Sequence, residues 1–122
     1  MSQTQKLAFG VGSIAFGQEA MMDSRERLLR FFEEAVELVR AGGLTLNDVQ
    51  NVVTYEFSRD IGVVTQEIAG TAVTLYAVAS AFGVDLEEVA GNECHRVLEN
   101  LEKIRAKQKA KPDHVKSARV AA

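Results

Sequence analysis

The sequence IGVVTQEIAGTAVTLYAVASAFGV, which runs from Ile61 to Val84, contains one charged residue, Glu67. Its alanine, valine, leucine and threonine residues predict a buried helix, in which Gly70 allows another backbone to approach closely. A carboxylate in such a helix loses solvation unless a cation, a hydrogen-bond donor or water meets it. Glu67 is therefore expected to have a partner. Our working hypothesis is a divalent metal ion shared with glutamates of the preceding long helix.

The residues before this stretch predict three further helices. Leu7 to Met22 is rich in apolar residues, although its three glycines disfavour a helix. From Arg25 to Ala41 a broad apolar face and a polar stripe alternate at helical spacing, and two glycines then end the helix. Thr45 caps a shorter segment that we interpret as a helix, although its β-branched residues also suit a strand.

The rest of the chain predicts one last long helix. Asp85 and Glu88 resemble a capping box at its start. Apolar residues spaced three and four apart form a seam suited to packing in a bundle or between subunits: Leu86, Ala90, Cys94, Val97, Leu101 and Ile104. Pro112 ends the regular structure and leaves residues 113–122 as a tail. We therefore expect a single all-α domain over residues 1–112, a bundle of about four long helices and one short connecting helix.

Composition and charge narrow the class of protein. The chain has 122 residues, 47% of them hydrophobic and 25% charged, as is usual for one soluble globular domain. The lone Cys94 excludes an internal disulfide and a cysteine-rich zinc site. No secretion signal is recognised, and the stretch around Glu67 is too polar to predict a membrane span. A cytoplasmic protein is expected.

The net charge of −3 is unevenly distributed. Residues 1–102 carry a balance of −9, whereas the residues from Lys103 onward carry +6. This basic end could hold phosphate or nucleic acid, or it could be a solvated helix end that favours cations by its dipole. The acidic body argues against nucleic-acid binding as the main function.

Glutamates on the helix from Arg25 to Ala41 are candidate metal ligands. Glu33, Glu34 and Glu37 are spaced so that pairs of them share one helix face. Mg²⁺ takes carboxylate oxygens and bridges to substrate phosphates, and facing helices of a bundle can build such a site. A solvated polar face would show the same pattern. Glu67 favours the metal site, because an isolated acid on an apolar helix needs an explanation.

Three segments together resemble a known family. They are RFFEEAVELV (30–39), QEIAGTAVTLYAVASAFGVDLEE (66–88) and LEKIRAKQKAKP (101–112). The chain resembles the MazG-like branch of the all-α nucleoside triphosphate pyrophosphohydrolases, which bind Mg²⁺ through an ExxE and an ExxD motif. Glu34 and Glu37 match the first motif, and Glu67 matches the first residue of the second. Gly70 stands where the family has aspartate.

The resemblance implies hydrolysis of a nucleoside triphosphate to a monophosphate and pyrophosphate, for nucleotide-pool control, with Mg²⁺ or alternatively Mn²⁺ as cofactor. It implies a homodimer or homotetramer. It assigns metal binding to Glu34, Glu37 and Glu67 and a catalytic base to Glu33 or Glu34. The residues it suggests for phosphate binding are Arg30, Lys103, Arg105 and Lys107, although Arg30 could instead pair with a neighbouring glutamate and the others could form an exposed basic helix end.

Two alternatives stay open. The first is a degenerate relative that binds nucleotide or a protein partner without turnover, because Gly70 removes a carboxylate. The second is a purely structural helical oligomer, which would bind no metal. No GxxxxGK[ST] or GxGxxG motif occurs in the chain, which excludes phosphate capture by such a loop.

Overall fold

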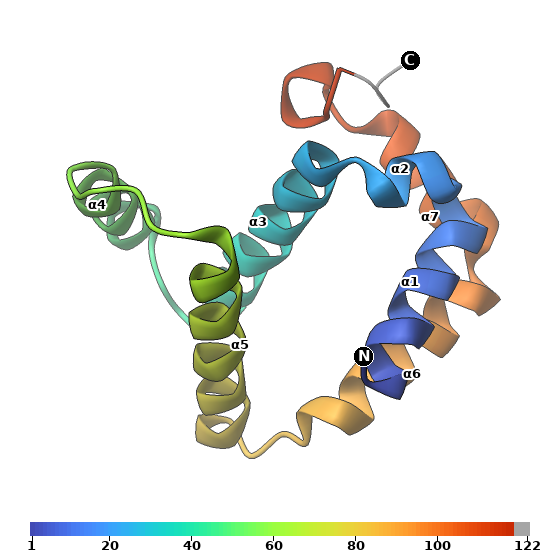
Figure 1. Cartoon of the computed structure of the whole chain (residues 1–122), viewed down its shortest axis with the longest axis horizontal. Coiled ribbons are helices and arrows are strands. Elements are labelled where there is room, and N and C mark those ends of the chain that lie inside the picture. Colours follow the sequence, from blue (N-terminus) through green and yellow to red (C-terminus); the bar gives the residue numbers. More distant parts are fainter. Residues whose placement is uncertain (119–122) are drawn as a thin grey trace. The chain divides into compact units, whose positions relative to one another are not determined.

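The computed structural model describes residues 1–118, and these residues form helices and connecting turns without a β-strand. The all-α class predicted from the sequence is confirmed. The elements, labelled in Figure 1, are α1 (Gln3–Phe16), α2 (Gln18–Met22), α3 (Ser24–Ala41), α4 (Leu46–Phe57), α5 (Val64–Ala81), α6 (Leu86–Glu99), α7 (Leu101–Ala110) and the 3₁₀ turn η1 (Asp113–Val115). Arg119, one of the terminal bases, lies outside the described residues.

The chain divides into two compact units. Among the described residues, 1–32 and 86–118 belong to the first unit, and 33–85 form the second. The division falls inside α3, so this helix begins in the first unit and ends in the second. No change in composition along the chain predicted this boundary, because α3 has one continuous amphipathic pattern.

Local sequence signals set both ends of the loop between α3 and α4. Gly43 has a φ of 104° and ends α3, with the Leu44 amide donating to the Val39 carbonyl at 2.9 Å. Thr45 and Asp48 form a reciprocal capping box at the start of α4. The hydrogen bond from the Thr45 amide lowers the pKa of Asp48 below its ordinary value. The prediction that α4 is a helix is confirmed.

Two predicted helices are interrupted in the structure. The first ends at Gly17, whose φ of 87° separates α1 from α2. The last is broken at Asn100, with φ −130° and ψ 33°, between α6 and α7. The side-chain amide of Asn100 donates to the Arg96 carbonyl at 2.8 Å, and this local competition with the backbone favours a helix end. The expectation of one continuous last helix was wrong.

The first unit packs α1 against α6 and α7, which lie alongside it in Figure 1. Val11, Ala15 and Cys94 are buried there, so the predicted place of Cys94 in a packing seam is confirmed. Helix α2 packs against α1, and the end of the Met21 side chain occupies the place where a Cβ at Gly12 would lie.

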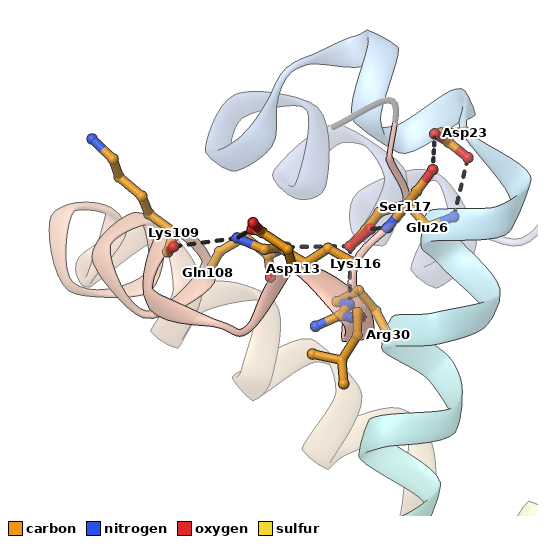
Figure 2. A network of polar contacts seen from close by, with 9 residues as sticks. Asp23, Glu26, Arg30, Gln108, Lys109, Asp113, Lys116 and Ser117 are labelled. Carbon is orange, nitrogen blue, oxygen red and sulfur yellow. Dashed lines mark hydrogen bonds and ion pairs between the residues drawn. The ribbon is translucent and has the colours of Figure 1, made fainter. Parts of the chain in front are cut away.

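Residues after Pro112 fold back onto α3 rather than trailing away as a tail. Glu26, only 1% exposed, accepts hydrogen bonds from Gln108 Nε2 at 3.2 Å and from the Ser117 amide at 3.0 Å. Its Oε1 also lies 3.0 Å from Arg30 Nε. The Ser117 hydroxyl donates to Asp23 at 2.9 Å, as Figure 2 shows. We call Asp23, Glu26, Arg30, Gln108 and Ser117 the C-terminal clamp.

Two further contacts hold the end of the chain to the clamp. Arg30 donates from Nη2 to the Val115 carbonyl. Lys116, which is buried, donates from Nζ to the Lys109 carbonyl of α7 at 3.3 Å. The boundary drawn at Pro112 from the sequence therefore separates residues of one hydrogen-bonded network, which extends to Ser117.

The second unit contains almost no fully buried residues. Ala79 is its one buried residue, and Glu67 is exposed. The prediction that α5 is buried is therefore wrong for the single chain, although its helical state is as expected. Among the described residues no single helix is long and apolar enough to cross a membrane; α5 and α6 meet that test only when taken together.

Candidate functional site

All four candidate acidic residues belong to the second unit. Glu33, Glu34 and Glu37 come from α3, and Glu67 comes from α5. Glu34, Glu37 and Glu67 are exposed, whereas Glu33 is half-buried. Because residues 24–41 form a helix, Glu34 and Glu37 lie about one turn apart on the same face of α3, as predicted.

Glu67 lies in the first turn of α5, where the helix dipole favours a negative charge. No side chain caps this helix end, because the N-cap residue is Val63. The carboxylate of Glu67 turns back over Gly62, and a Cβ at residue 62 would collide with it. Gly62 thus leaves the space that this conformation of the carboxylate requires.

The structure does not gather these carboxylates into a metal-binding group. Within residues 1–118, no cluster of three or more His, Cys, Asp or Glu side chains is placed to hold a metal ion. The carboxylates are chemically suited to Mg²⁺, but the arrangement in the single chain does not fit the ion. A Cβ at Gly70 would meet nothing within 4 Å, so there is room for the aspartate that the sequence lacks.

The hydroxyls next to Gly70 do not replace that aspartate. Thr71 Oγ1 donates to the Glu67 carbonyl at 2.7 Å, and Thr74 Oγ1 donates to the Gly70 carbonyl at 3.0 Å. Both side chains are thus bonded to the backbone of their own helix. Glu67 is the one acidic side chain that α5 offers.

The predicted phosphate-binding residues all lie in the first unit, and two of them have structural contacts. Arg30 belongs to the C-terminal clamp. Arg105 donates from Nε to the Ala15 carbonyl and from Nη2 to the Ile14 carbonyl, each at 2.8 Å. These carbonyls lie in the last turn of α1, where a cation is favoured. Lys103 and Lys107 are exposed on α7.

We expect Arg105→Ala to lower the free energy of unfolding by about 1–2 kcal/mol, because two charge-assisted hydrogen bonds to α1 are lost. Lys103→Ala, on the same helix, should change it by less than about 0.5 kcal/mol. Urea denaturation followed by circular dichroism would measure both. Equal stabilities of the two variants would show that Arg105 does not hold α1.

Sequence reasoning did not predict that polar residues of the first unit are buried or half-buried. Arg27 is half-buried, and its Nε has no hydrogen-bond partner among the described residues. Burial lowers the pKa of Arg27 below its ordinary value, although the negative charges of Glu26 and Asp23 act to raise that pKa. No local signal could have paired Glu26 with Ser117, which lie 91 positions apart in the chain.

Comparisons with protein-family models, with curated proteins and with solved structures found no match. The resemblance to the MazG-like family therefore remains a prediction from three sequence segments.

Proposed function

We propose that the protein is a Mg²⁺-dependent nucleoside triphosphate pyrophosphohydrolase with a MazG-like bundle, acting in nucleotide-pool control in the cytoplasm. The observation that supports the proposal is the exposure of three candidate carboxylates within one unit. Glu34 and Glu37 are exposed one turn apart on α3, and Glu67 is exposed at the start of α5 in the same unit. Their carboxylate oxygens are the kind of ligand that Mg²⁺ prefers when it is bound to a triphosphate.

The residues have distinct proposed roles. Glu34, Glu37 and Glu67 would hold Mg²⁺ or Mn²⁺, which neutralises phosphate charge and activates water for attack when it is bound. Glu33 or Glu34 would serve as the catalytic base, as the family resemblance implies. Lys103 and Lys107 remain available for phosphate, whereas the contacts of Arg30 and Arg105 favour structural roles.

A second candidate function is nucleotide binding without turnover. It is favoured by Gly70, which leaves α5 with one carboxylate. It is also favoured by the absence, within residues 1–118, of three acidic side chains close enough to hold a metal ion together. Loss of a carboxylate lowers affinity for a metal ion, so a triphosphate could bind without being cleaved. This candidate and the hydrolase predict the same fold and differ in product.

A panel of nucleoside triphosphates incubated with the protein and Mg²⁺ would test both functions. The hydrolase predicts release of pyrophosphate from at least one triphosphate and none when Mg²⁺ is chelated. Titration of a non-hydrolysable triphosphate by calorimetry should be run in parallel. Binding without pyrophosphate release would support the second candidate, and neither binding nor release would contradict both.

A further inference from the structure

The last described residues of the chain, 113–118, form a segment that we call the strap, and its buried side chains are polar. Lys116 and Ser117 are 7% and 3% exposed, whereas Val115 is half-buried. Among the described residues, the buried apolar side chains of the first unit all belong to α1 and α6. The strap adds no fully buried apolar side chain to that core, so its release would leave the core in place.

Hydrogen bonds join the strap to two helices. Nζ of Lys116 donates to the Lys109 carbonyl of α7, and the Ser117 amide donates to Glu26 of α3, as Figure 2 shows. Each bond of this kind contributes little net stability, because water replaces it when the segment is released. A chain end that is held in this way opens at a lower free energy than packed helices do. The strap is therefore expected to open before the rest of the first unit.

Ser117 presents two hydrogen-bond donors to two buried carboxylates. Its hydroxyl donates to Asp23 Oδ2 at 2.9 Å, and its amide donates to Glu26 Oε2 at 3.0 Å. Asp23 is 8% exposed and Glu26 is 1% exposed, so water does little to screen their charges. An ionised carboxylate accepts hydrogen bonds and donates none. The closed strap therefore requires a neutral donor at residue 117.

We propose that the strap is a charge-sensitive latch, which is closed while residue 117 is neutral and opens when that residue carries a negative charge, with α1, α6 and α7 still folded. A negative group at this position would face the Asp23 carboxylate in a site that excludes most water, where like charges are disfavoured. Release of the strap brings the added charge into water, which solvates it. Phosphorylation is a modification of serine that supplies such a charge, about −1.5 to −2 near neutral pH.

Two cations close to Ser117 already have partners. Nε of Arg30 lies 3.0 Å from Glu26 Oε1, and Nζ of Lys116 donates to a carbonyl of α7 at 3.3 Å. Arg27 is half-buried on α3, near enough to the two carboxylates for their charges to act on its pKa. If Arg27 paired with a negative residue 117, the added charge would hold the strap closed more firmly. The sign of the effect therefore tests the proposal.

The latch does not depend on the proposed reaction. The strap and the two carboxylates that it contacts belong to the first unit, whereas the candidate metal ligands belong to the second. The latch would be present in a chain that cleaves no triphosphate, and its test measures opening of the strap and not release of pyrophosphate.

Hydrogen exchange of the full chain, followed by NMR, would measure opening of the strap. The amide of residue 117 is protected by its bond to Glu26, and its protection is the intrinsic exchange rate of each sequence divided by the measured rate. Ser117→Asp should lower this protection at least about tenfold relative to Ser117→Asn, which has the same shape and no charge. Amides of α6 around the buried Cys94 should keep the protection that they have in wild type.

Two further variants separate the position of the charge from its presence. Ala118→Asp places the same charge on the neighbouring exposed residue and should leave the protection of residue 117 within about twofold of wild type. Adding Asp23→Asn to Ser117→Asp removes the repulsion, keeps an N-cap residue for α3, and should restore the protection at least about threefold. Protection of residue 117 in Ser117→Asp that equals or exceeds that in Ser117→Asn, or loss of protection in α6 together with the strap, would overturn the proposal.

Discussion

Glu26→Ala should lower the free energy of unfolding by about 3–5 kcal/mol, the usual cost of removing one partner of a buried ion pair. Glu26 is 1% exposed and lies at the centre of the C-terminal clamp. Its removal would leave the half-buried Arg30 without its ion pair to this carboxylate and the buried Ser117 amide without its acceptor. Urea denaturation monitored by circular dichroism would measure the loss.

The matched control is Glu93→Ala. Glu93 also pairs with an arginine, Arg96, but both side chains are 57% exposed. The hydrogen bond from Arg96 lowers the pKa of Glu93, yet solvent screens such pairs, and we expect a cost below about 1 kcal/mol. Equal effects of the two substitutions would mean that the clamp does not stabilise the first unit.

Glu67→Gln should reduce pyrophosphate release by about 100-fold or more, if the proposed function is correct. A carboxylate that binds a catalytic metal supplies several kcal/mol, and each 1.36 kcal/mol is a tenfold change in rate. Glutamine keeps the shape of the side chain and removes its charge. Because Glu67 is exposed, the fold should be unaffected. Steady-state assays at several Mg²⁺ concentrations would separate weaker metal binding from slower chemistry.

Glu56→Gln provides the control for charge alone. Glu56 lies on α4 of the same unit and is an exposed partner of Arg59. Its substitution should leave the rate within about twofold, because an exposed pair contributes little. If Glu34→Gln abolished activity while Glu67→Gln did not, α5 would have no part in the site, and the glutamates of α3 alone would carry it.

Local signals in the chain were sufficient to predict the class of fold and most helix boundaries. The loop between Gly43 and Thr45 was predicted correctly, because a positive φ and a capping box depend on residues a few positions apart. The break at Asn100 is also local, but a seam of apolar residues continues through it, and the side-chain hydrogen bond that marks it has no unique sequence pattern.

The candidate site was only partly predictable. The helical spacing of Glu34 and Glu37 follows from sequence, since it depends on one helix. Whether Glu67 approaches them depends on how α3 and α5 pack, and the described chain does not bring three acidic groups together. The low charge of α5 was interpreted as a sign of burial within the chain, although the same pattern suits a face that another molecule covers.

The sequence by itself determined that the protein is all-helical, where most of its helices begin and end, and which residues are candidate metal ligands. These properties depend on contacts within one or two helical turns. Only the tertiary structure decided that Val115 and Ser117 contact α3, that Arg105 holds the end of α1, and that α5 is exposed. Each of these depends on residues distant in the chain, whose meeting is set by the packing of whole helices.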